Sequence, residues 1–253
     1  LLECLKGIVY RGTEQAAKED SDDDDFVVDS LANAKRNDMR EKLLCIVTAF
    51  ELLQGQGEYL MDRGMHDVHK LLTLTPFGPA GESLNVDLGD FVTALYALIL
   101  PLSLSPTIEE APYLARSSMT LAHRQTHKLA QTEADLLFRA LTVIFLVSRS
   151  LPSSVRTLAY SKRLISASLN WPAATQLRTL TFLRSLLIRE PKLEAMLETS
   201  DRRVDGRWRG LVDTPELAEP ESTCWFEATV YYRQHPDEKV RAEARKLVNW
   251  QRE

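Results

Sequence analysis

Apolar residues recur every three or four positions along almost the whole chain, whereas no long stretch alternates apolar and polar residues. The first spacing gathers apolar side chains on one face of an α-helix, and strict alternation would indicate a half-buried strand. The pattern therefore predicts an all-α protein. In the first half it predicts a helix over residues 34–54, ended by Gly55, and a second helix over 88–100, stopped by Pro101 and Pro106.

The second half of the chain is more regular than the first. Thr132 and Asp135 have the spacing of a capping box, with Asp in the usual Glu or Gln place. Pro172 stands where a helix would begin, and proline is tolerated in a first turn. Residues 200–220 carry Pro, Gly and Asp and predict a loop. Helices are predicted over residues 133–149, 153–169, 172–189, 191–198, 221–234 and 237–251.

The predicted helix starts at positions 132, 153, 172 and 191 recur about every 20 residues, so that two helices span about 40. This is the period of HEAT and armadillo arrays, in which each helix pair buries its apolar face only against its neighbours. We therefore expect a HEAT/armadillo-like α-solenoid of stacked helix pairs. A compact helical bundle is the competing architecture.

Four segments follow from these patterns. Residues 1–11 are interpreted as the end of a preceding helical region, because they carry apolar residues at helical spacing, and the chain opens without Met as a piece of a longer protein would. Residues 12–33 contain the run EDSDDDD and predict an acidic disordered linker, since like charges at that density resist folding. Residues 34–253 form the predicted solenoid domain, with 62–83 as a loop insertion.

Composition narrows the class of protein. The chain has 44% apolar and 26% charged residues, as ordinary globular proteins do. Its three cysteines are far apart, which favours reduced thiols in a cytosolic or nuclear protein. The most apolar stretch, from Phe91 to Leu104, has 14 residues and is too short to span a bilayer, so we expect no membrane association. No signal peptide is recognisable at the start.

The net charge of −5 hides a strong asymmetry along the chain. Residues 1–110 hold 9 Lys and Arg against 20 Asp and Glu, whereas residues 116–209 hold 16 against 7. A surplus of nine positive charges attracts phosphate groups. This favours nucleic-acid contact, although basic residues spread evenly over solvated helix faces would give the same count.

The sequence offers no constellation that recommends an enzyme. No phosphate-binding glycine loop and no nucleophile motif is present. His123 and His127 would share one helix face, but further zinc ligands are missing nearby. We therefore expect a non-catalytic protein with no cofactor, no metal and no small-molecule substrate.

The predicted loop contains four arginines around one tryptophan. Guanidinium groups match phosphate geometry, and an indole ring offers a stacking face for a base. The candidate RNA-binding residues are Arg202, Arg203, Arg207, Trp208 and Arg209. The equally weighted alternative is that Trp208 packs into the groove of the solenoid while the arginines pair with Asp201, Asp205 and Asp213.

A second candidate surface is the aromatic group of Trp225, Phe226, Tyr231 and Tyr232 on one predicted helix. Core packing is the favoured interpretation, and a surface for a protein partner is the alternative. The candidate partner-binding residues are Trp225, Phe226, Glu227, Tyr232, His235 and Pro236.

Three segments together resemble the CCAAT-binding-factor family. They are LCIVTAFELL followed by GQGE at 44–58, LNVDLGDF continuing to LYALILPLSL at 84–104, and PELAEP at 215–220 followed by WFE and by HP at 235–236. The resemblance covers about residues 43–253. The chain departs from the family pattern before the final HP, where it reads YYRQHP instead of a segment richer in His and Tyr, and in the insertion at 62–83.

This resemblance implies a non-catalytic assembly factor of the nucleolus and nucleoplasm that acts on precursors of the large ribosomal subunit. It further implies a heterodimer with another nucleolar complex protein, and contacts with pre-ribosomal proteins and pre-rRNA. The alternative hypothesis is a protein–protein adaptor without RNA contact, linked to the initiation of DNA replication.

Overall fold

The structure is a computed structural model that describes residues 7–8, 38–51, 89–110, 131–148, 152–198 and 207–251. Every regular element in these residues is helical. Besides the helix over 38–51, the longer helices are α5 (Gly89–Leu102), α7 (Glu133–Leu141), α8 (Ser154–Ser168), α9 (Ala173–Arg189), α10 (Phe226–Gln234) and α11 (Glu238–Val248). The predicted all-α class is confirmed. The predicted 12–33 linker and 62–83 insertion lie outside the described residues.

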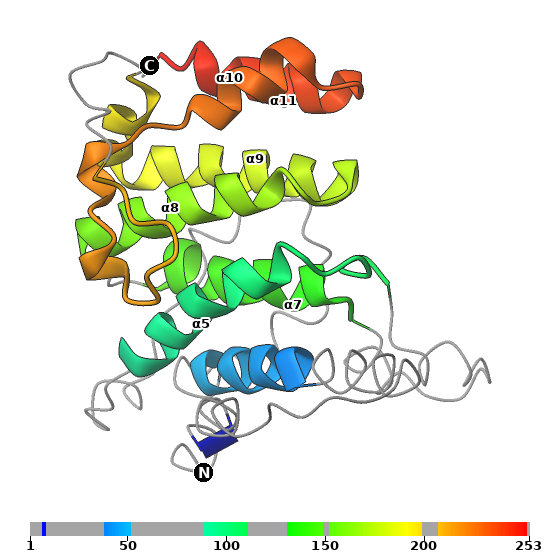
Figure 1. The fold of residues 1–253 in the computed structure, drawn as a ribbon, viewed down its shortest axis with the longest axis vertical. Coiled ribbons are helices and arrows are strands. Elements are labelled where there is room, and N and C mark those ends of the chain that lie inside the picture. The colour runs from blue at the N-terminus through cyan, green and yellow to red at the C-terminus, as the bar shows by residue number, and fades with distance from the viewer. Residues whose placement is uncertain are drawn as a thin grey trace, which may run out of the picture.

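The helices are stacked along the long axis of the molecule and lie roughly across it (Figure 1). The helix over 38–51 lies at one end, α5 and α7 follow, α8 and α9 lie above them, and α10 with α11 forms the far end. Such a stack is consistent with the solenoid that the spacing of helix starts predicts. None of the helices in the described parts of the chain is long and apolar enough to cross a membrane.

Aromatic side chains join the successive layers. The ring of Tyr160 on α8 lies 5.1 Å from that of Tyr96 on α5 and 4.9 Å from that of Phe145. Phe182 on α9 lies 6.3 Å from Phe138 on α7. Edge-on and tilted ring pairs at these distances are favourable, and burying each ring adds hydrophobic stabilisation. One contiguous core therefore runs through the stack from α5 to α11.

Ion pairs tie α9 to the helices on either side. Arg184 binds Glu243 of α11 at 2.7 Å, and Lys246 binds the other oxygen of that carboxylate at 2.7 Å. Burial alone would raise the pKa of Glu243, but the hydrogen bonds from Lys246 and Arg184 outweigh it and lower the pKa. On the other side of α9, Arg178 binds Asp135 of α7 at 2.8 Å.

The capping box predicted at Thr132 is confirmed at the start of α7. The Thr132 hydroxyl accepts from the Asp135 backbone N–H at 3.0 Å, and the Asp135 carboxylate accepts from the Thr132 N–H at 3.1 Å. These two bonds satisfy donors that a helix N-terminus leaves open. The starts of α8 and α9 fall at Ser154 and Ala173, within a residue of their predicted places.

Four predicted helices differ from those in the structure. The helix expected to stop before Pro101 continues through it to Leu102, because a proline in a last turn removes only one hydrogen bond and the Ser103 hydroxyl binds the Leu100 carbonyl at 2.6 Å. The expected helix over 191–198 is instead the 3₁₀-helix η3 (Pro191–Leu197).

The third difference lies in the predicted helix over 133–149, which changes at residue 142 into the π-helix η2 (Thr142–Val147). Its wider turn is closed by a bond from the Ser148 N–H to the Val143 carbonyl at 3.0 Å. Arg189 of α9 donates to the carbonyls of Leu146 and Ser148. The guanidinium thus satisfies carbonyl groups that the end of η2 leaves unpaired.

The predicted helix over 221–234 begins only at Phe226. Before it lie the 3₁₀-helix η5 (Pro220–Ser222) and an extended segment that is fixed in the core. The Trp225 N–H donates to the Met196 carbonyl at 2.7 Å, and the Cys224 carbonyl accepts from Lys162 at 2.9 Å. Because these backbone groups bind other elements, they are not available for an earlier helical turn.

Candidate protein and RNA interface

Residues 207–222, named the strap here, run along one side of α8 and include the 3₁₀-helices η4 (Pro215–Leu217) and η5 (Figure 1). Arg163 of α8 holds the strap in place. The Arg163 side chain is 2% exposed and donates to the Gly210 carbonyl at 2.8 Å and to the Val212 carbonyl at 2.5 Å. The same guanidinium donates to the Tyr96 carbonyl of α5 at 2.9 Å. One buried cation therefore joins α5, α8 and the strap.

Arg163 also lies over an aromatic ring. Its guanidinium carbon is 3.7 Å from the centre of the Tyr96 ring, a cation–π contact in a dry environment. Burial lowers the pKa of Arg163, and burial raises the pKa of Tyr96 to about 12. The Tyr96 hydroxyl and the Arg163 Nε have no hydrogen-bond partner among the described residues.

A second buried cation anchors the segment that follows the strap. The Lys162 side chain, 2% exposed, lies 2.7 and 2.8 Å from the two carboxylate oxygens of Glu227. It also donates to the Cys224 carbonyl at 2.9 Å. All three donors of the ammonium group are thereby used. The first turn of α10 is held against α8 by this network.

The RNA-binding candidates are divided by the structure. Arg202 and Arg203 lie outside the described residues. Arg207 and Arg209 are exposed, and Arg209 lies 3.7 Å from Glu219. Trp208 is partly buried and packs against the core. The structure thus brings Trp208 to the α8 groove, as the alternative interpretation expects, while keeping two arginines at the surface.

Trp208 borders a small pocket of about 150 Å³ between the strap, α5 and α8. A Cβ atom at Gly210 would lie 3.1 Å from the Trp208 indole nitrogen, so glycine allows this close approach. The other residues that line the pocket are Leu100, Ser103, Arg163, Ser166, Ala167 and Asn170.

The charges on the strap differ from those of the longer basic region. Residues 207–222 hold two arginines and four carboxylates, at Asp213, Glu216, Glu219 and Glu221. Glu216 binds Arg156 of α8 in an exposed ion pair. Two apolar side chains, Leu211 at 80% and Leu217 at 60%, are exposed beside these carboxylates. Exposed apolar groups among charges are typical of protein interfaces.

The partner-binding candidates are also divided. Trp225 is 1% exposed and donates from its indole to the Ser161 hydroxyl at 3.3 Å, and Glu227 is held by Lys162. Phe226 is 52% exposed. Pro236 is exposed and Tyr232 partly buried, with the Arg245 guanidinium 5.4 Å from its ring centre.

His235 links α10 to α11 and is partly buried. Its ring Nδ1 accepts from the Asp237 N–H at 3.0 Å, and its carbonyl accepts from Arg241 at 2.6 Å. His66, His69, His123 and His127 lie outside the described residues. Within the described residues no group of three or more His, Cys, Asp or Glu could hold a metal ion.

The sequence that forms most of these helices matches a known family. Residues 42–244 match the CBF/Mak21 family. The chain belongs to the CBF/Mak21 family. This confirms the resemblance seen in the sequence, and the matched range contains α8, the strap and α10 in full.

Two proteins whose sequences are similar to this CBF/Mak21 chain carry the same name. It is 30% identical over 210 residues to nucleolar complex-associated protein 3 of Schizosaccharomyces pombe. It is 29% identical over 211 residues to nucleolar complex-associated protein 3 of Saccharomyces cerevisiae. The alignments cover 83% and 81% of this chain but only 25% and 27% of the relatives, so the chain spans about a quarter of their length.

Sequence reasoning missed Lys162 and Arg163, which organise this region of the CBF/Mak21 domain. The signal was present, because two consecutive cations occur in the middle of a helix between Tyr160 and Leu164. Lys and Arg are almost never fully buried unless they are paired. Such a pair within an apolar run therefore indicates internal carboxylates or carbonyls as partners.

Proposed function

We propose that this chain is part of a non-catalytic assembly factor that works in the nucleolus and nucleoplasm on precursors of the large ribosomal subunit. In this proposal it binds another nucleolar complex protein as a heterodimer and contacts pre-ribosomal proteins and pre-rRNA. The observation that carries the proposal is the alignment of 83% of the chain with a protein named nucleolar complex-associated protein 3. Membership of the CBF/Mak21 family over residues 42–244 supports it.

The physical form of the domain suits a scaffold. Stacked helices present a long surface whose side chains are fixed by a continuous core. The polar groups inside it, such as Lys162 and Arg163, are engaged with carbonyls and with the carboxylates of Glu227 and Asp213. They hold elements of the described chain together. Binding through the surface is therefore the activity that this geometry supports best.

The pre-rRNA contact is proposed at the start of the strap. Arg207 and Arg209 have exposed side chains there, next to the partly buried Trp208, and Arg202 and Arg203 precede them in sequence. Cations at the surface exchange counterions for phosphate, so that RNA affinity would fall steeply with salt.

A second candidate function is a protein–protein adaptor without RNA contact, linked to the initiation of DNA replication. The observation that favours its first part is the charge of the strap itself, where four carboxylates outnumber two arginines. This local negative charge opposes phosphate and suits a basic protein segment.

Affinity purification of the tagged chain from nuclear extract, with ultraviolet crosslinking to RNA, tests the proposal. We expect large-subunit pre-rRNA crosslinks and a second nucleolar complex protein in equal amount. Recovery of neither contradicts the assembly role.

A charge-reversal variant separates the two candidates. Changing Arg202, Arg203, Arg207 and Arg209 to Glu should remove the RNA crosslinks and keep the protein partner if the strap contacts RNA. Loss of the partner with the RNA crosslinks kept would show that these arginines bind protein, and absence of RNA crosslinks already in the wild type would favour the adaptor. The control reverses Lys192, an exposed cation in η3.

A further inference from the structure

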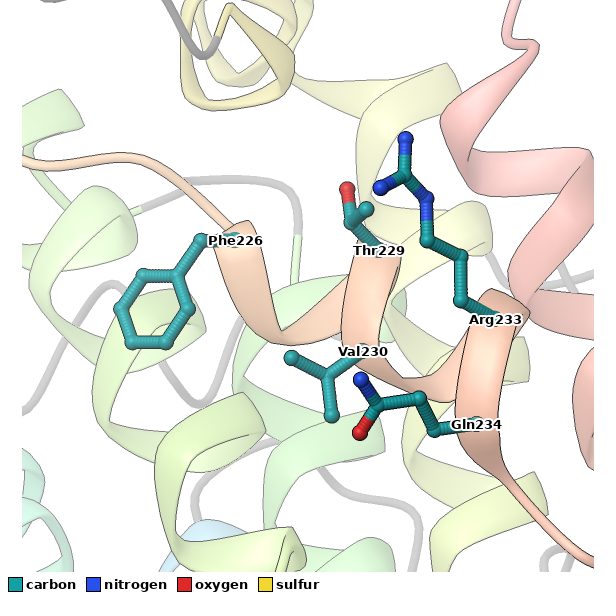
Figure 2. Close-up of a pocket in the computed structure, with 5 residues that line it drawn as sticks. All are labelled: Phe226, Thr229, Val230, Arg233 and Gln234. Carbon is teal, nitrogen blue, oxygen red and sulfur yellow. The ribbon is translucent and has the colours of Figure 1, made fainter.

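The outer face of α10 carries a groove that no other element of the described chain fills. Its volume is about 330 Å³, and all five residues that line it come from α10 itself. They form two rows at a spacing of four residues, as Figure 2 shows: Phe226, Val230 and Gln234 along one side, Thr229 and Arg233 along the other. Rows at this spacing are the ridges between which a second helix packs.

This face combines two exposed apolar side chains with three polar ones. Ala228 and Tyr231 are buried on the inner face of α10, so that face already packs against the rest of the domain. Yet Phe226 is 52% exposed and Val230 is 38% exposed on the outside. Because covering these side chains would remove apolar surface from water, the face favours a partner.

The charge at the groove has one sign. Arg233 is the charged member of the five lining residues, and its side chain forms no ion pair with the described residues. On the neighbouring α11, the exposed Lys239 and Arg245 outnumber the exposed Glu238. The charge that complements this groove is therefore a carboxylate.

The groove is formed before any partner arrives. The Lys162 ammonium lies 4.1 Å from the centre of the Phe226 ring, and Glu227 fixes the same turn to α8. α10 also packs along α11. A preformed surface loses little side-chain freedom on binding, which lowers the cost of association.

We propose that the outer face of α10 binds an amphipathic acidic helix of a protein partner. One apolar side chain of that helix lies in the groove between Val230 and Thr229 and against Phe226, and a carboxylate about one turn away pairs with Arg233. This inference rests on the proposed scaffold function, to which it adds the site and the chemistry of the partner.

A photo-crosslinking amino acid at Val230 tests the inference in the tagged chain, expressed in the cells it comes from. The control places the same amino acid at Ala242, an exposed position on α11. We expect position 230, and not position 242, to crosslink to one segment with apolar residues at helical spacing and at least one carboxylate. Crosslinks to RNA, to a second copy of this chain, to a segment without carboxylates, or none above the control would overturn the inference.

The crosslinked segment, made as a peptide, then serves as the probe for binding to the purified chain. Arg233→Glu should weaken binding by about 10-fold or more, and Arg233→Lys by less than about 3-fold. Reversing the carboxylate in the peptide to Lys should restore binding to the Glu variant, and absence of that rescue contradicts the pairing. Arg233 is exposed, so both variants should keep the thermal unfolding midpoint of the wild type.

Sedimentation of the wild-type chain with large-subunit precursors, measured in parallel, separates the two levels of the proposal. If the chain sediments with these particles but position 230 gives no such crosslink, only the docking inference fails. If the chain is absent from the particles, the proposed function fails.

Discussion

Arg163 gives the sharpest test of how the strap is held. Replacing it with Met keeps the length of the side chain but removes the donors to the carbonyls of Tyr96, Gly210 and Val212. The partly buried carbonyls of Gly210 and Val212 each lose a partner at a cost of about 1–3 kcal/mol, while the cost of burying the charge is recovered. We therefore expect Arg163→Met to lower the free energy of unfolding by about 3–4 kcal/mol.

Arg156 provides the matched control, because it also reaches from α8 to the strap. Its ion pair with Glu216 is partly exposed, with side chains 28% and 39% accessible. Exposed pairs contribute about 0–1 kcal/mol, so Arg156→Met should cost no more than that. Urea unfolding of the whole chain measures both variants, and limited proteolysis reports whether cleavage moves into residues 207–222. Equal losses for the two variants would refute the role given to Arg163.

Three further predictions concern buried polar groups. Lys162→Met should lower the free energy of unfolding by about 3–5 kcal/mol, because it leaves the carboxylate of Glu227 buried and unpaired. Changing both residues to Met should lower it much less, and additive losses in a double-mutant cycle would contradict this. Tyr96→Phe should raise the free energy of unfolding by about 1 kcal/mol, because the hydroxyl it removes has no hydrogen-bond partner among the described residues; a loss in urea unfolding would oppose it. The pKa of Glu243 is lowered in the folded chain, so its ion pairs stabilise the fold above the ordinary pKa of 4.5 and are lost as the pH falls through the folded value. As the pH falls through that range, the free energy of unfolding should therefore decrease more for the wild type than for Glu243→Gln. Parallel plots of the free energy of unfolding against pH would contradict this prediction.

The stacked helices could be predicted because their signals are local. Thr132 with Asp135 marks the start of α7, and Ser153 caps α8 by accepting from the Arg156 N–H. Apolar residues at helical spacing then fix which faces are buried. A regular distance between helix starts was enough to suggest a stack.

The strap and its anchors could not be predicted from local patterns. Lys162 binds Glu227, which lies 65 residues further along the chain, and Arg163 binds carbonyls 47 and 49 residues away. Sequence reasoning counts such cations toward a basic surface, because Lys and Arg are usually exposed. Their burial depends on acceptors that only the folded chain brings together.

The candidate sites show the same division. The exposure of Phe226 beside the buried Trp225 follows from the turn at which α10 begins, and that start is set by the contacts of Cys224 and Trp225 with other elements. The aromatic cluster in the sequence predicted either a core or a partner surface, and the structure places Trp225 in the core and leaves Phe226 exposed. Arg233, which supplies the charge of the α10 groove, had no signal of its own in the sequence.

Rapid depletion of the protein followed by pulse labelling of ribosomal RNA tests the central claim most directly. The assembly role predicts that precursors of the large-subunit rRNA accumulate and mature large-subunit rRNA falls, while small-subunit rRNA is made at its normal rate. Normal production of large-subunit rRNA after complete depletion would contradict it.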